Sequence, residues 1–172
     1  MRNDELARLI ASLAATRNAL VRPAILIAIE TAMRRGELLA LTWSAIDLDK
    51  RTAHIPDTKN GDARTIPLTD AALNIFKALP QRDPRVFPMT PMALKLAWNR
   101  VRVRAGVPDL RFHDLRHEAI SRFAEMGLTT VELAVISGHR DLRMLNRYTH
   151  LEPSHLARKL AGRSWDKEVM NA

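Results

Sequence analysis

The only tyrosine of the chain, Tyr148, lies among positive charges near its end. In the segment SGHRDLRMLNRYTHL, residues 137–151, His139 comes nine positions before it and arginines stand at positions 140, 143 and 147. Nearby positive charges stabilise a phenolate and attract anions. A tyrosine oxygen in this setting is suited to attack phosphorus, and that reaction requires other groups that hold a phosphate.

The segment FHDLRHE, residues 112–118, is the first candidate phosphate site. His113 and Arg116 are one helical turn apart, so their side chains share a face. Asp114 favours the start of a helix, which would place both residues in its first turn, beside outward-pointing backbone N–H groups. A helix N-terminus, an imidazole and a guanidinium together can bind a phosphate. The motif is short, and a solvated helix face is an equally good interpretation of it alone.

The second candidate is Arg34, in the segment TAMRRGEL that follows an apolar stretch at residues 23–29. Glu37 comes three residues later and can hold the guanidinium by charge-assisted hydrogen bonds. The alternative is that Arg34 and Arg35 are surface charges at the end of a helix. We expect this alternative for Arg35, whereas Arg34 depends on the rest of the sequence.

Lys59 and His139 are weaker candidates when each is taken alone. Lys59 lies in TKNG, the predicted tip of a β-hairpin, where a lysine is commonly a solvated charge. A lysine that reaches a phosphate site can instead protonate a leaving alkoxide. Gly138 has the position of a helix C-cap residue, so His139 should lie on a turn between two helices and face outward.

Composition sets the limits for the elements that position these groups. The chain has 172 residues, 47% of them hydrophobic, which suits one domain with a sizeable core. Its 27 Lys and Arg against 19 Asp and Glu give a charge of +8 and favour a polyanionic partner such as nucleic acid, although a ribosomal or membrane-surface protein would look similar. The sequence has no cysteine, so we expect no thiolate metal site. It also has no signal-peptide pattern and no long apolar run, and we therefore expect a cytoplasmic protein.

Hydrophobic periodicity predicts a mainly helical domain with a small antiparallel three-stranded sheet at one edge. We expect strands near residues 45–48, 52–55 and 64–67, with the hairpin turn at residues 59–61. Helices are predicted at residues 4–15, at 23–41 with an interruption near Gly36, and at 70–79, 92–105, 115–126, 130–137, 142–148 and 153–161. Residues 163–172 are polar and are expected to be a loose tail.

Taken in order, these motifs resemble the tyrosine recombinases of the phage-integrase family. Five motifs occur in the family's order and at its approximate spacing, over about residues 4 to 160: TAMRRGELLALTW, the hairpin lysine, HDLRH, SGH and RYTH. The resemblance implies the catalytic-domain fold of that family, with Tyr148 as nucleophile and a pocket formed by Arg34, Lys59, His113, Arg116 and His139. Ala32, where the family usually has glycine, and Glu118, where threonine is frequent, depart from the pattern.

The resemblance also implies a mechanism. Tyr148 would attack the scissile phosphate, leaving a 3′-phosphotyrosyl link and a free 5′-hydroxyl, while Arg34 and Arg116 clamp the phosphate oxygens. The remaining roles would be proton donor to the leaving oxygen for Lys59, acid/base partner of the tyrosine for His113, and hydrogen-bond donor to the phosphate for His139. No metal, ATP or other cofactor would be needed.

The expected partner is double-stranded DNA at an attachment-type site, and no membrane contact is expected. We expect the protein to be a tetramer on DNA and a monomer when free. We expect residues 1–172 to be a single catalytic domain, a fragment of a longer phage or genomic-island integrase in a bacterial or phage-infected cell, without the family's N-terminal DNA-binding domain. The alternatives are DNA relaxation of the type IB topoisomerase kind and a non-catalytic DNA-binding module. His117 is expected to be a structural or surface residue.

Overall fold

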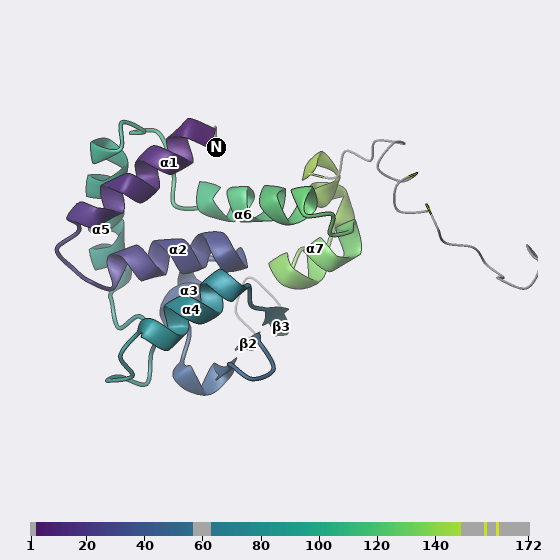
Figure 1. Cartoon of the computed structure of the whole chain (residues 1–172), viewed down its shortest axis with the longest axis horizontal. Coiled ribbons are helices and arrows are strands. Elements are labelled where there is room, and N and C mark those ends of the chain that lie inside the picture. Colours follow the sequence, from purple (N-terminus) through teal and green to yellow (C-terminus); the bar gives the residue numbers. More distant parts are fainter. Residues whose placement is uncertain (1–2, 57–62, 149–156, 158–160, 162–172) are drawn as a thin grey trace, which may run out of the picture.

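The computed structural model describes residues 3–56, 63–148, 157 and 161. The chain is mainly helical, and its one small sheet lies at an edge of the molecule (Figure 1). The helices are α1 (Asn3–Ser12), α2 (Val21–Thr31), α3 (Arg35–Ala40), α4 (Asp70–Ala78), α5 (Pro91–Arg104), α6 (Asp114–Glu125) and α7 (Thr130–Ser137). Three 3-10 segments, η1 (Leu13–Ala15), η2 (Trp43–Ala45) and η3 (Leu142–Tyr148), join or follow them. The mainly helical architecture predicted from the sequence is confirmed.

The sheet has the order β1 (Ile46–Asp47), β2 (Thr52–Ile55) and β3 (Arg64–Pro67), and both pairings are antiparallel. Ala53 pairs with Ile66, and both side chains are fully buried against the core. The next pair, His54 and Thr65, is exposed, as alternation along a strand requires. The three predicted strands are therefore confirmed, and β3 packs on α7.

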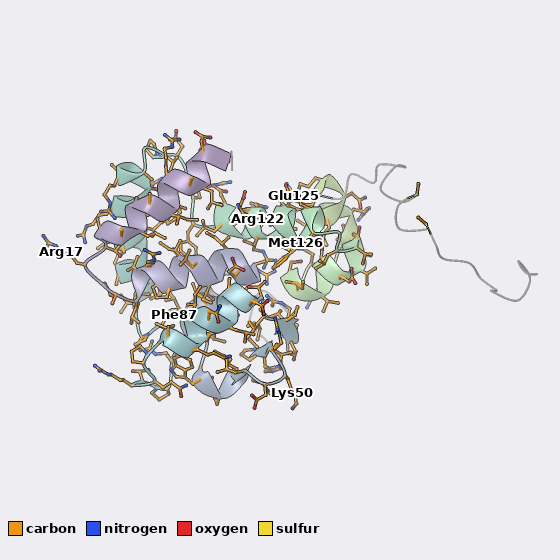
Figure 2. The ribbon with its side chains drawn as sticks, in the orientation of Figure 1. Arg17, Lys50, Phe87, Arg122, Glu125 and Met126 are labelled. Carbon is orange, nitrogen blue, oxygen red and sulfur yellow. The ribbon has the colours of Figure 1, made fainter. Side chains whose placement is uncertain are left out.

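Helix α2 forms the centre of the main core. It runs beside α6 across the middle of the molecule and also packs on α4 (Figure 1). Its Ile25, Ile27 and Ala28 are at most 1% exposed, and burial of this kind is the dominant force that holds helices together. Phe87, on the loop before α5, lies in the same core, whereas Arg17 and Lys50 project outward at two different edges of the molecule (Figure 2).

A smaller apolar cluster lies where α6, α7 and η3 meet. Ala119, Ile120 and Leu133 are buried there with Leu145 of η3, and the ring of Tyr148 packs on the cluster. Gly138 ends α7 in the left-handed conformation, with φ of 69°, as the sequence predicted for a helix C-cap. This cluster sets the position of the chain segment that carries the tyrosine.

The interruption of the second predicted helix occurs earlier than Gly36. Helix α2 ends at Thr31, Ala32 follows in the left-handed conformation with φ of 54°, and α3 begins after Arg34. The predicted interruption near Gly36 is thus present, but it lies at residues 32–34, and Gly36 itself lies inside α3. A carboxylate explains the shift, because Glu37 accepts the backbone N–H of Arg34 and thereby starts a new helix at that point.

Three predicted features lie outside the described residues: the hairpin turn at 59–61, most of the helix at 153–161, and the tail at 163–172. Among the described residues, no helix is long and apolar enough to span a bilayer.

Candidate active site

Arg34 is held by a buried carboxylate. Its Nη1 donates to Oε1 of Glu37 and its backbone N–H to Oε2, both at 2.8 Å, so the predicted contact between Arg34 and Glu37 is present. Arg64 of β3 donates to the same two oxygens, at 3.0 and 2.8 Å. Burial alone would raise the pKa of Glu37, but the hydrogen bonds from Arg64 and Arg34 outweigh it and lower the pKa to about 2. The carboxylate is therefore ionised at neutral pH.

Arg116 is the most deeply buried cation of the site, at 3% exposure. Its Nη1 donates to the carbonyl of Ala32 at 2.6 Å and its Nη2 to the carbonyl of Ser137. Burial, followed by the charge of Arg34, lowers the pKa of Arg116 to about 10, so the guanidinium remains charged at neutral pH. A guanidinium has five N–H groups, so this anchoring leaves others of the same side chain for a phosphate.

The Tyr148 hydroxyl contacts a histidine of α6 that was expected to be structural. Nδ1 of His117 and Oη of Tyr148 are hydrogen-bonded, and their rings stack with centroids 6.2 Å apart. The ring of His113 meets His117 edge-on at 4.9 Å, so His117 lies next to both residues. His117, and not His113, therefore contacts the hydroxyl, while the acid/base role expected for His113 stays a prediction. The four-residue spacing of the two histidines on one helix face was the signal for His117.

The protonation states of this trio follow from burial. Burial lowers the pKa of His117, and the charge of His113 lowers it further, so His117 is neutral near pH 7 and its Nδ1 can accept a proton in the tautomer protonated at Nε2. Burial raises the pKa of the Tyr148 phenol, and the opposing charges of Arg147 and Arg116 do not overcome it. The two arginines favour the phenolate, as expected, but burial outweighs them and the phenol keeps its proton. A tyrosine in this state needs a base.

His139 lies on the turn after α7, as predicted, and is fixed by Ser137. The Ser137 hydroxyl donates to the carbonyl of Leu133 at 2.6 Å, so Nδ1 of His139, 2.7 Å away, is the donor to its oxygen. The second ring nitrogen, Nε2, is then the one available to a ligand. Burial, with the charges of Arg116 and Arg34, lowers the pKa of His139 to about 4.

The start of α6 differs from the expected open helix N-terminus. Its backbone N–H groups at residues 114, 115 and 116 donate to the carbonyls of residues 111, 112 and 113, at 3.0, 3.3 and 3.1 Å. A tight turn before the helix therefore uses the donors that a phosphate would have met. Side chains, chiefly Arg116, are left to bind an anion here.

Two hollows lie near these groups. One of about 340 Å³ opens beside His113 and Arg116 and is also lined by Arg35 and Arg111. A larger one, about 1040 Å³, lies between α3 and the sheet, but Asp47 and Asp49 on its rim disfavour a phosphate. The smaller, cationic hollow therefore fits an anionic substrate better. Within the described part of the chain, no group of three His, Cys, Asp or Glu side chains could hold a metal ion.

The structure thus brings together Arg34, His113, Arg116, His139 and Tyr148, and adds Arg64, His117 and Ser137. Lys59 lies outside the described residues. No local pattern marked Arg64, because its partners are 27 and 72 residues away in the sequence.

The sequence and the fold of this chain are similar to those of known proteins. The sequence model of the phage integrase family matches residues 1–155. The shufflon-specific DNA recombinase of Escherichia coli is 50% identical over 139 residues, which are 80% of this chain and 36% of that protein. The catalytic domain of bacteriophage HP1 integrase has a similar structure, with a TM-score of 0.76 and 27% identity, covering 97% of this chain and 96% of that one. XerH recombinase bound to its difH substrate shares the fold, with a TM-score of 0.70 and 20% identity, over 94% of this chain and 53% of that one.

Proposed function

This chain belongs to the phage integrase family, and on that premise we propose that it is the catalytic part of a site-specific DNA recombinase. Because the chain spans about a third of the length of its shufflon-recombinase relative, the activity is proposed for a longer protein. Its substrate is double-stranded DNA at an attachment-type site, within a bacterial or phage-infected cell. The active assembly on DNA is a tetramer of protomers that are monomeric when free.

The observation that carries this proposal is the hydrogen bond between Oη of Tyr148 and Nδ1 of His117, next to two anchored guanidiniums. A phenol, a neutral imidazole and a cationic pocket are the groups that nucleophilic attack on a phosphodiester requires. His117 takes the phenol proton as Oη bonds to phosphorus. The bond from phosphorus to the 5′ oxygen breaks, which leaves DNA joined to Tyr148 through its 3′ phosphate.

Arg34 and Arg116 bind the non-bridging oxygens of that phosphate and offset the charge of the transition state. Both guanidiniums are oriented before DNA arrives, Arg34 by Glu37 and Arg116 by two backbone carbonyls. Preorganised donors of this kind need no reorientation as charge develops, which is the source of their catalytic effect.

Two proton donors complete the proposal. His139 donates from Nε2 to a phosphate oxygen and takes up a proton to do so, because its Nδ1–H is used by Ser137. The phosphate anion supplies the charge that raises the histidine pKa from its low DNA-free value. Lys59 protonates the departing 5′ oxygen. The energy of the broken bond is kept in the phosphotyrosine, so religation needs neither ATP nor a metal ion.

A nicked suicide substrate tests this function. The protein is incubated with nicked duplexes carrying its recombination site, or a pool of random sequence where the site is unknown, and denaturant-resistant protein–DNA adducts are isolated. We expect an adduct from the wild type, with the phosphodiester mapped to Tyr148 by mass spectrometry, and none from Tyr148→Phe.

Each arm of that experiment addresses one statement. Absence of any adduct from the wild type would refute the enzyme, and an adduct that survives Tyr148→Phe would refute the nucleophile. Cleavage that stops on addition of a chelator would contradict the metal-free reaction. Plasmid relaxation without strand exchange would indicate the topoisomerase alternative.

A further inference from the structure

Arg64 is an almost completely buried arginine at the start of β3, with 8% of its side chain exposed. Its guanidinium contacts two separate parts of the candidate site. One end donates from Nη1 and Nη2 to the two carboxylate oxygens of Glu37, a fork-to-fork geometry. The other end donates from Nε to the carbonyl of Ile136 at 3.0 Å, in the last turn of α7.

The contact with Glu37 places Arg64 behind Arg34. Glu37 accepts two hydrogen bonds from Arg34 and two from Arg64, so the carboxylate lies between the two guanidiniums. Without Arg64, a carboxylate with 2% of its side chain exposed would keep only Arg34 as its counter-charge. Removing one partner from a buried ion pair is costly and lets the remaining groups rearrange.

The contact with Ile136 places Arg64 beneath the turn that carries His139. A Cβ atom added at Gly138 would lie 3.1 Å from Nε of Arg64 and 3.2 Å from its Cδ and Cζ. The chain just before His139 therefore rests directly on this guanidinium. Arg116 holds the next carbonyl, that of Ser137, so two arginines share the free end of α7.

From these contacts we propose that Arg64 is a positioning residue that couples Arg34 to His139 without contacting DNA. This inference rests on the proposed function. It explains why the sheet belongs to the site: β3 carries the side chain that sets the distance between the clamp arginine and the turn after α7. Lysine cannot replace it, because an ammonium has no planar fork to meet a carboxylate and a carbonyl at the same time.

The test compares Arg64→Lys with Arg51→Lys, which makes the same change at an exposed arginine just before β2 whose partner is Asp70. We expect Arg64→Lys to lower single-turnover cleavage of the nicked substrate at saturating DNA about 10²-fold, the loss typical of a misplaced catalytic group. Its Kd for DNA should change less than about threefold, and Arg51→Lys should leave cleavage and Kd at wild-type values.

A purely structural role would lower the amount of folded protein and leave the rate per folded molecule unchanged. Cleavage within threefold of wild type in a folded Arg64→Lys protein would overturn the proposal. A Kd that weakens in parallel with the rate would overturn it too, because Arg64 would then contact DNA. If Arg64→Lys does not fold, Glu37→Asp is the second variant, because it withdraws the carboxylate from both arginines. It is expected to cleave more slowly while its Kd for DNA stays nearly unchanged. Wild-type cleavage by Glu37→Asp would refute the coupling.

A readout independent of catalysis separates this inference from the proposed function. In nitrogen-15 NMR spectra of Arg64→Lys, the backbone signals of Arg34 and of Gly138 and His139 should all shift, whereas Arg51→Lys should move none of them. Shifts confined to β3 would refute the coupling, whether or not the wild type cleaves DNA. If the wild type forms no adduct but the shifts are found, the function fails and the coupling stands.

Discussion

Tyr148 requires a proton acceptor, because burial raises the pKa of its phenol and the nearby arginines do not lower it enough. His117 is the side chain hydrogen-bonded to the hydroxyl, and the ring of His113 contacts the ring of His117. General-base catalysis of this kind contributes about 10²- to 10⁴-fold to a rate. We therefore expect the second histidine of HDLRH, His117, to be the base.

His117→Gln is predicted to slow cleavage by about 10²- to 10⁴-fold and to remove the acidic limb of the pH–rate profile. A base must be neutral to accept a proton, and the pKa of His117 lies below its ordinary value of 6.5. The wild-type rate should therefore be flat near pH 7 and fall as pH drops through that lowered pKa. Single-turnover cleavage measured from about pH 5 to about pH 8, a range that brackets the reference pKa of histidine, gives this profile.

His54→Gln serves as control for that prediction, because His54 is exposed on the sheet with Thr65 as its partner. It should leave the profile unchanged. If His113→Gln removes the acidic limb and His117→Gln keeps it, the base is His113 and the DNA-free contact is not the reacting one.

At the scale of elements, the junction between α2 and α3 sets the positions of Arg34 and Arg116 relative to each other. Ala32 turns the chain there with a positive φ, and its carbonyl accepts Nη1 of Arg116. A left-handed conformation costs a residue with a Cβ about 1–2 kcal/mol. The family's usual glycine would avoid this cost, so Ala32 represents local strain at the site.

Ala32→Gly is predicted to change the free energy of unfolding by less than about 1 kcal/mol, because relief of strain offsets the loss of a buried methyl group. Ala7→Gly is the matched control within a helix, in the exposed middle of α1, and should destabilise by about 1 kcal/mol. Denaturant unfolding of both variants gives the comparison. A loss at Ala32 larger than at Ala7 would show that the turn carries no strain.

At the scale of the whole molecule, cations extend from the candidate site toward α5. Arg35 and Arg111 line the hollow beside His113 and also line a second hollow with Lys95. Arg35 and Lys95 are both exposed. A DNA backbone that enters the site at Arg116 would pass these side chains, which would hold phosphates that flank the scissile one.

The double variant Arg35→Gln with Lys95→Gln is predicted to reduce the slope of log K against log salt by about 2, one for each lost phosphate contact. Arg17→Gln with Lys50→Gln removes the same charge from two other edges of the molecule (Figure 2) and should lower the slope by less than about 0.5. Titration of labelled duplex DNA at several salt concentrations measures both slopes. Equal slopes for the two double variants would place the DNA elsewhere.

Local patterns were sufficient to predict most of the elements, because helix periodicity, strand alternation and cap residues act over a few residues. They placed the three strands, the Gly138 cap and the contact between Arg34 and Glu37. The order of the motifs was sufficient to identify the family. The position of the break, at Ala32, was missed because glycine is the usual signal for a positive φ, and here an alanine adopts it.

The amino-acid sequence by itself determined the chemical groups of this protein: one phenol, its arginines and histidines, and their order along the chain. Only the tertiary structure decided how they pair. Packing of α2 on α6 brings Ala32 to Arg116, and packing of α7 on β3 brings Ile136 to Arg64. The physical reason is that a pKa, a hydrogen bond and a base assignment depend on burial and on distances of a few ångströms. Those distances join residues far apart in the sequence, which no local pattern records.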